Sequence, residues 1–435
     1  MHNKGSRHPL NTSGKKPIEL LAPASNLLKV KIALHYGADA VYVGAKQFSL
    51  RHMSDNLDVD ELGEAVLYAH QQNKKIYLAC NAFLKQSVLD DFEKWFDSIK
   101  QYEFDAYIVS DPAAIAIIKK IKPDACLHLS TQANTVNSII VNTFRNMGVS
   151  RFILARELGI EEIRQIYKQT QADLEVFVHG AMCLAYSGRC LLSYYFTFPS
   201  LAARTSEKHP YRNANEGRCV QPCRWEFNLQ YSQELSRPEQ ILPAEPIESG
   251  TLLLSSKDLC LINHLPALAA AGIRSFKIEG RMKSIYYIAN TVRCYRKAID
   301  ELYLDNQDSL MPLVNREIKK ISHREYSTGF FFRDPLHDAN IVNNESYRRS
   351  HRLIGYIKQV TDIELYEVHL FNKIEKTQNL EIIGPEMKNL NLIDFEILNN
   401  NKESVEFLNH SQECYIRSKI PLALFDILRI PFKNF

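Results

Sequence analysis

The sequence contains no run of about 18 consecutive apolar residues, the length that a membrane-spanning helix requires. Its first residues, MHNKGSRHPLNTSGKKP, are polar and basic and lack an apolar core, so we expect no secretory signal peptide. We therefore expect a cytoplasmic protein without membrane contact, in a compartment where thiols stay reduced. There, nine cysteines predict metal-binding or catalytic roles for some of them and not a disulfide framework.

Several catalytic motifs are also absent. The chain has no G-x-S-x-G elbow and no H-E-x-x-H helix, so hydrolysis has no visible motif. It has no G-x-G-x-x-G after its first predicted strand and no phosphate-binding loop. The net charge of +3 is slight, so it allows a nucleic-acid partner without arguing for one.

From Ile18 onward, short β-branched runs alternate with amphipathic stretches. Such runs, flanked by helices, are typical of a parallel sheet that is buried on both faces. Eight strand–helix units favour a closed TIM-type (β/α)8 barrel, with its last helix capped by Ser284. The predicted strands are residues 18–22, 40–44, 75–80, 106–110, 126–130, 151–155, 174–178 and 275–279.

The chain of 435 residues is too long for one ordinary core and predicts a large domain with a smaller one. We expect a disordered basic tail at 1–17, the α/β barrel at 18–335 and a small C-terminal β-barrel or sandwich domain at 336–435. Over ninety residues separate the seventh and eighth strands, where a helix and short loops are usual. We therefore expect a cysteine-rich insertion at 179–270.

The insertion contains Cys183, Cys190, Cys219 and Cys223, spaced as C-x6-C and C-x3-C with 28 residues between the pairs. Four thiolates can saturate a tetrahedral metal or hold a four-iron cluster. Neither pair has the C-x2-C spacing of zinc ribbons, which favours iron–sulfur. Structural zinc, or burial of these thiols as small apolar side chains, remains an alternative, and Cys260 is the reserve ligand.

Polar residues just beyond the predicted strands should meet at the carboxyl end of the barrel, where the chemistry of this fold lies. Lys277 alternates with Phe276 and Ile278, so we expect it inside the barrel, paired with Glu175 or Glu279. The polar residues expected at this mouth are Asn81, Asp111, Thr131, Gln132, Asn134, Arg156, Glu157, His179, Glu279 and Arg281.

Arg156, Arg281 and Lys277 together suit an anionic substrate, because guanidinium groups bind carboxylates with two hydrogen bonds. We take these three residues and His179 as candidate catalytic residues. The alternative is that the charges only pair with neighbouring glutamates, and that His179 is merely hydrogen-bonded at a strand end.

A dense basic cluster lies in the predicted β domain. It consists of Arg348, Arg349, His351 and Arg352, with Tyr347 beside them. Basic residues with an aromatic neighbour can hold an RNA backbone and stack a base. The alternative is a strand edge that its charges protect from pairing.

The stretches EVFVHGAMCLAYSGRC, GRCVQPCRW, SSKDLCLI and SFKIEGRMKS resemble the collagenase-like peptidase family U32 over about residues 18–335. The C-terminal part is similar to the extra domain of one subgroup. That resemblance implies participation in the prephenate-dependent 5-hydroxylation of the tRNA wobble uridine, with tRNA and a prephenate-like dicarboxylate as partners. An electron-donor protein is a further candidate partner.

The resemblance also implies a 4Fe–4S iron–sulfur cluster on Cys183, Cys190 and Cys219, with Cys223 or Cys260 as the fourth ligand. The basic barrel mouth would accept a dicarboxylate such as prephenate. Two other functions remain open. One is the proteolysis that the family name implies, and the other is a scaffold that holds structural zinc.

Overall fold

The structure is a computed structural model of the chain. It describes residues 17–50, 54–183, 185–186, 190–193, 214, 219–224, 226–227, 246–247, 250–252, 256–304, 309–332, 347–410 and 412–432. All but the last residue of the predicted basic tail, 1–17, lies outside the described residues.

Eight parallel strands form a closed barrel, as predicted. Each strand pairs with its neighbour in chain order, and β12 closes the ring by pairing with both β1 and β7. Every residue of β2 is buried, as expected for a strand covered on both faces. The strands are β1 (Glu19–Pro23), β2 (Ala40–Gly44), β3 (Lys75–Cys80), β4 (Ala106–Val109), β5 (Leu127–Leu129), β6 (Val149–Ile153), β7 (Asp173–Ala181) and β12 (Ser275–Ile278).

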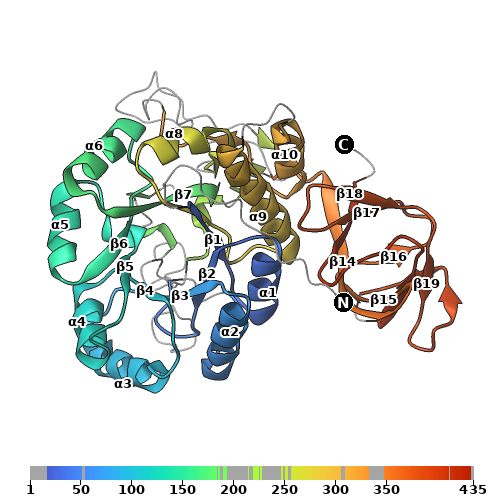
Figure 1. Ribbon diagram of the computed structural model, residues 1–435, viewed down its shortest axis with the longest axis horizontal. Helices are drawn as coiled ribbons and strands as arrows, with labels where there is room; N and C mark the ends of the chain where they lie inside the picture. Colours follow the sequence, from blue (N-terminus) through green and yellow to red (C-terminus); the bar gives the residue numbers. More distant parts are fainter. Residues whose placement is uncertain are drawn as a thin grey trace.

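Helices surround this barrel (Figure 1). The Ser284 side chain caps α9 as predicted, accepting a hydrogen bond from the Tyr287 amide. Asp58, which was not predicted as a cap, forms a capping box with Glu61. No helix in the described ranges is long and apolar enough to cross a membrane. The barrel helices are α1 (Leu27–His35), α2 (Val59–Gln71), α3 (Leu89–Ile99), α4 (Pro112–Ile121), α5 (Ser138–Asn146), α6 (Ile160–Thr170), α8 (Leu265–Ala270) and α9 (Ile285–Asp300).

Strand β7 continues past the barrel because a later segment pairs with it. Strand β11 (Asp258–Cys260) runs antiparallel to its end, with Cys260 opposite His179, and also pairs with β13 (Tyr326–Ser327). The end of the predicted insertion, 179–270, therefore rejoins the barrel, and α8 is the helix that precedes β12. Three short strands form a separate sheet: β8 (Glu226–Phe227), β9 (Pro246–Ile247) and β10 (Gly250–Leu252).

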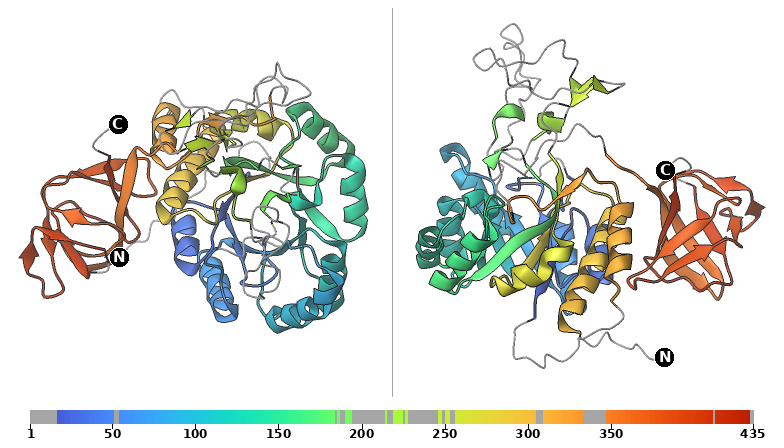
Figure 2. Two further views of the ribbon diagram at one scale, coloured as in Figure 1. Left: turned by 180° about the vertical axis from the view of Figure 1, so that it is seen from behind. Right: turned by 90° about the horizontal axis from the view of Figure 1, so that it is seen from above.

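The C-terminal domain is an antiparallel β domain with its own hydrophobic core, as predicted. It lies to one side of the barrel, next to α9 and α10 (Met311–Glu317) (Figure 2). Eight of its strands form one sheet in the order β18-β17-β23-β14-β15-β22-β19-β20, while β16 and β21 pair separately. The strands are β14 (His351–Asp362), β15 (Leu365–Leu370), β16 (Ile374–Glu375), β17 (Leu380–Ile383), β18 (Asn389–Leu392), β19 (Glu396–Leu398), β20 (Ser404–Val405), β21 (Phe407–Leu408), β22 (Cys414–Arg417) and β23 (Ile427–Pro431).

Buried ion pairs join this domain to the barrel. The Nη2 atom of Arg429, in β23, lies 2.7 Å from Glu317 Oε2 and 2.7 Å from Glu381 Oε2. Arg293, in α9, places its own Nη2 2.7 Å from the same Glu317 oxygen. Burial opposes ionisation of Glu317, but Arg429 and Arg293 outweigh it and lower the pKa of this carboxyl to about 2. Breaking one of these pairs would leave an unpaired buried charge.

Candidate functional site at the barrel mouth

A cavity of about 510 Å³, counting its open mouth, lies at the carboxyl end of the barrel strands. Its lining residues belong to strand ends or to the turns that directly follow them, so the closure of the barrel brings them together. The polar lining residues are Tyr42, Asn81, Ser130, Thr131, Gln132, Arg156, Lys277, Glu279 and Arg281. Seven of these nine were predicted from the sequence, and Tyr42 and Ser130 were missed.

Lys277 lies on β12 with its side chain inside the barrel, as its alternation with apolar residues predicts. Its Nζ atom is 3.0 Å from Glu175 Oε1 and 4.4 Å from the ring centroid of Tyr42. Burial lowers the pKa of the Lys277 ammonium, while Glu175 opposes that shift. The predicted partner Glu175 is thus confirmed, and the ammonium borders the cavity beside an aromatic face.

A layer of charge beneath the cavity holds Glu175 in place. Its Oε2 atom accepts a hydrogen bond from Ser275 Oγ at 3.0 Å and lies 3.5 Å from Arg151 Nη1. Arg151 also bonds Glu19 and, through Nε at 2.8 Å, Asp173. Sequence analysis missed this layer, although a signal was present: Arg151 interrupts an apolar strand, and a charge inside a sheet needs partners.

Arg156 approaches the cavity from the turn after β6. Its Nη1 atom donates a hydrogen bond to the Ala181 carbonyl at 2.8 Å, and its Cζ atom lies 5.0 Å from the Phe177 ring centroid. The contact with the end of β7 fixes the guanidinium at the rim.

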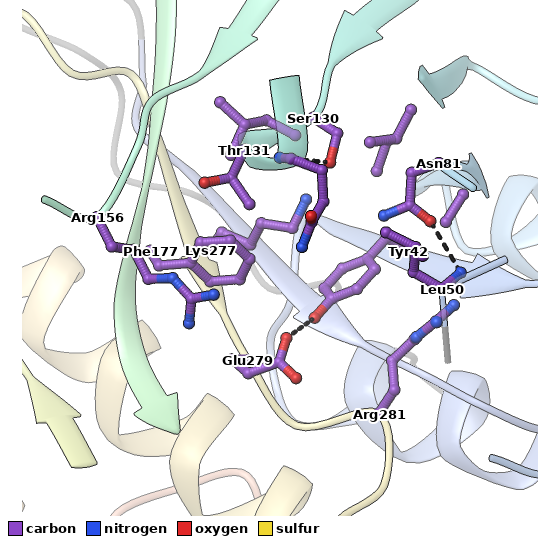
Figure 3. Close-up of a pocket in the computed structure, with 14 residues that line it drawn as sticks. Tyr42, Leu50, Asn81, Ser130, Thr131, Arg156, Phe177, Lys277, Glu279 and Arg281 are labelled. Carbon is purple, nitrogen blue, oxygen red and sulfur yellow. Dashed lines mark hydrogen bonds between the residues drawn. The ribbon is translucent and has the colours of Figure 1, made fainter. Parts of the chain in front are cut away.

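Arg281 approaches from the turn after β12. Its Nη1 atom donates to Ser49 Oγ at 2.8 Å. A Cβ atom at Gly44 would lie 2.0 Å from that nitrogen, so glycine at this position leaves the room that Arg281 occupies. Figure 3 shows Arg156 and Arg281 on opposite sides of Glu279, whose Oε2 atom lies 3.3 Å from Tyr42 Oη.

The lining therefore combines three basic side chains, Arg156, Lys277 and Arg281, with a single carboxylate, that of Glu279. Leu50, Ile108, Ile153 and Phe177 supply apolar wall. This concave site has more basic side chains than carboxylates, and part of its wall is apolar. Such a site suits a small organic anion, because the basic side chains offset the cost of removing the anion from water.

Three residues expected at the mouth do not line the cavity. Asp111 caps α4 instead, accepting hydrogen bonds from the amides of Ala113 at 2.8 Å and Leu84 at 2.9 Å. Asn134 ends a short 3₁₀ turn in a left-handed conformation, and Glu157 follows Arg156 without joining the lining. A position after a strand predicts the end of the barrel, but side-chain direction decides which residues reach the cavity.

His179 also lies outside the cavity lining. It is buried among the rings of Tyr287, Tyr295 and Tyr326, with Nδ1 3.3 Å from Tyr295 Oη. Burial lowers the pKa of His179 to about 3, so the imidazole is neutral at physiological pH. This position favours the alternative in which His179 is a packed, hydrogen-bonded residue at a strand end. It gives no support to the predicted catalytic role of His179.

The candidate cluster ligands Cys183, Cys190, Cys219 and Cys223 are all half-buried. Backbone amides donate to two of the sulfurs: Leu192 to Cys190 at 3.4 Å, and Gln221 to Cys219 at 3.3 Å. Burial raises the pKa of the Cys190 thiol, and the nearby Cys183 and Cys219 raise it further.

Three of these thiols are thus electrostatic neighbours, and the amide-to-sulfur bonds are of the kind that tune iron–sulfur centres. However, the described residues contain no group of three or more His, Cys, Asp or Glu side chains arranged to hold a metal ion. The donor chemistry of the cysteines fits a cluster, but within the described part of the chain these side chains do not form a complete set of ligands.

Cys260, the reserve ligand, faces the barrel. Its Sγ atom lies 3.9 Å from Tyr295 Oη, and burial raises the pKa of this thiol to about 11. Cys183 follows two residues after the end of β7 at Ala181, the residue whose carbonyl accepts the hydrogen bond of Arg156. The cysteine-bearing segment therefore starts at the rim of the cavity.

The general class of this protein is a (β/α)8 barrel with a cationic cavity at its mouth, a cysteine-bearing rim and an appended β domain. Within it, the chain belongs to peptidase family U32: the profile of that family matches residues 25–340, and the profile of its C-terminal domain matches residues 349–429.

Several relatives cover most of the chain. The tRNA hydroxylation protein P1 of Bacillus subtilis is 35% identical over 376 residues, covering 86% of this chain and 85% of the relative. The tRNA hydroxylation protein P of Escherichia coli is 34% identical over 406 residues, covering 85% and 86%. An uncharacterized protease of Methanocaldococcus jannaschii is 36% identical over 379 residues, covering 84% and 87%.

Proposed function

We propose that this protein is an RNA-modifying enzyme of the cytoplasm that takes part in the 5-hydroxylation of the wobble uridine of tRNA. Relatives named as tRNA hydroxylation proteins, aligned over more than four fifths of the chain, support the reaction class. The observation that carries the proposal is the cavity itself, in which Arg156, Lys277 and Arg281 surround an apolar-walled space at the catalytic end of the barrel.

The proposed co-substrate is a prephenate-like dicarboxylate. Arg156 and Arg281 stand on opposite sides of the cavity, so each is placed to bind one carboxylate. Lys277 supplies a third positive charge beside the Tyr42 ring, and the apolar wall suits a hydrocarbon ring between the two carboxylates. The cations thus bind and orient the anion while the walls exclude water.

We further propose that Cys183, Cys190, Cys219 and Cys223 hold a 4Fe–4S cluster, which when bound would pass electrons or polarise substrate. An electron-donor protein would then be a partner. Cys223 is preferred over Cys260 as fourth ligand because Cys260 contacts Tyr295 on the barrel side. Anaerobic purification should yield about four irons and four sulfides per chain, and Cys219→Ser should lose them. Zinc without sulfide would support the scaffold alternative.

The function is tested by mass spectrometry of tRNA nucleosides from a deletion strain. We expect loss of 5-hydroxyuridine and the nucleosides made from it, provided that the strain lacks a second protein for the same step. Unchanged nucleosides in such a strain would contradict the proposal.

Peptide hydrolysis is the alternative, because one relative is named as a protease. Among the described residues, no histidine lines the cavity to activate a nucleophile. We therefore expect no gelatin cleavage by anaerobically purified protein. Cleavage that survives Cys183→Ser and Cys190→Ser would favour the peptidase.

A further inference from the structure

A basic surface lies where the barrel mouth meets the C-terminal β domain. It consists of Lys283, which follows β12, and of Tyr347, Arg348 and Arg349, which precede β14. Arg348 and Arg349 are exposed, and Lys283 and Tyr347 are half-buried. These four residues are named the junction strip.

The junction strip is fixed to the barrel by its backbone. The Arg348 amide donates to the His323 carbonyl at 2.8 Å, and the His323 amide donates back to the Arg348 carbonyl at 3.2 Å. The next barrel residue, Arg324, is buried and places its Nη2 atom 2.7 Å from Asp258 Oδ1. The exposed arginine side chains therefore extend from a backbone that buried contacts hold in place.

Tyr347 holds the basic groups together. Its ring centroid lies 4.9 Å from Lys283 Nζ and 5.8 Å from Arg324 Cζ. Such cation–π contacts attract the ammonium to the ring face and so orient the lysine. Tyr347 is thus a positioning residue for Lys283, and the base-stacking role that the sequence pattern predicts stays a prediction.

Two short paths connect the junction strip to the cavity. The Lys283 amide donates to the Gly280 carbonyl at 2.9 Å, closing the turn that also carries the cavity residue Arg281. On the other side, Asp258 lies opposite Ala181, whose carbonyl accepts the hydrogen bond of Arg156. The junction strip therefore lies beside the turn that carries Arg281 and near the strand end that binds Arg156.

The rest of the predicted basic cluster does not join this surface. His351 faces the domain junction, with Nε2 3.6 Å from Glu381 Oε1, and Arg352 is half-buried in β14. The buried pair of Arg429 with Glu317 holds the two domains together. The strip therefore keeps one position relative to the cavity.

We propose that the junction strip binds the phosphate backbone of an RNA strand whose target base enters the cavity. This inference rests on the proposed function and specifies where its RNA substrate is held. Lysine and arginine contacts to phosphates supply sequence-independent affinity and set the register of the strand. A base that is modified inside a pocket must leave its stack, so flanking phosphates need a fixed anchor beside that pocket.

The test measures binding of bulk tRNA to the full-length protein over a series of salt concentrations. We expect the double variant Arg348→Ala/Arg349→Ala to bind about tenfold more weakly and to reduce the slope of log affinity against log salt by about 1 to 2. Tyr347→Ala should weaken binding, while Tyr347→Phe, which keeps the ring, should not. The control is Arg417→Ala, an exposed arginine in β22 that is outside the junction strip and forms an ion pair with Glu396 at 2.6 Å.

If the double variant bound tRNA with the affinity and salt slope of the parent, the proposal that the junction strip binds RNA would be wrong. Equal competition by polyglutamate of matched charge would also overturn it, because the surface would then bind any polyanion. If the strip variants weaken tRNA binding while deletion leaves tRNA hydroxyuridine unchanged, the proposed function fails and the strip stands. If deletion removes hydroxyuridine but the strip variants bind normally, the function stands and the strip fails.

Discussion

The position of the Arg281 guanidinium depends on the absence of a side chain at Gly44. Gly44→Ala would place a methyl group 2.0 Å from Arg281 Nη1 and 2.7 Å from Ser49 Oγ. We expect a loss of about 1–3 kcal/mol in the free energy of unfolding, and weaker prephenate binding in calorimetry. Gly159→Ala is the control, because its nearest contacts are 3.6 Å or longer. Full prephenate affinity in Gly44→Ala would contradict the assignment of Arg281.

Variants of the Lys277–Glu175 pair can distinguish a role of Lys277 in ligand binding from a role in stability. Lys277→Met leaves the fully buried Glu175 without its nearest cation, and we expect about 3 kcal/mol of destabilisation in urea unfolding. Lys277→Met/Glu175→Gln should recover most of that loss, because no uncompensated charge remains. If the double variant still bound prephenate as the parent does, Lys277 would be structural only.

Much of the cavity lining could be predicted from the sequence. Residues that directly follow a barrel strand are expected at the mouth, and a polar residue that alternates with apolar residues along a strand is expected inside the barrel. Sequence analysis succeeded for Arg156, Arg281 and Lys277. It failed for Asp111, because a helix cap uses the same residue types as a binding site. It also placed His179 in the site, because the sequence does not show that β7 continues past the barrel.

The junction between α9, α10 and β23 responds to acid. The pKa of Glu317 is about 2, below its ordinary value of 4.5, so its stabilisation is complete above pH 4.5 and is lost as pH falls towards 2. Glu317→Gln should be about 3 kcal/mol less stable at pH 7. The two unfolding curves should converge between pH 4.5 and 2, with a residual slope because Glu381 also has a lowered pKa.

Urea unfolding at several pH values checks this prediction. Asp426, whose pKa burial raises from 3.8 to about 6, contributes with the opposite sign between pH 6 and 3.8, so it overlaps only the upper end of this window and is the same in parent and variant. A constant difference between parent and variant from pH 7 to pH 2 would show that Glu317 carries no charge-dependent stabilisation.

Elements were predicted well where periodicity is strong. Every barrel strand lies within two or three residues of its predicted range, because buried parallel strands read as short apolar runs. Strand β11 was not predicted: SSKDLCL resembles a helical pattern, and only its pairing with distant β7 makes it a strand. Pairing between segments so far apart leaves no local signature.

At the scale of the whole molecule, the β domain is more than an appendage. Its junction with α9 and α10 buries Arg293, Glu317 and Arg429 almost completely. Separating the domains would break the Arg429–Glu317 pair, so we expect this pair to favour the docked arrangement. The sequence predicted both domains but not this contact, since ion pairs between distant segments follow from docking alone.

The central claim is that the cationic cavity serves tRNA hydroxylation. The most direct measurement is mass spectrometry of tRNA nucleosides from a strain without 5-hydroxyuridine that expresses this protein. We predict that the parent restores 5-hydroxyuridine, and that Lys277→Met/Glu175→Gln, expressed at the same level and folded, does not. No restoration by the parent, or full restoration by the double variant, would contradict the account.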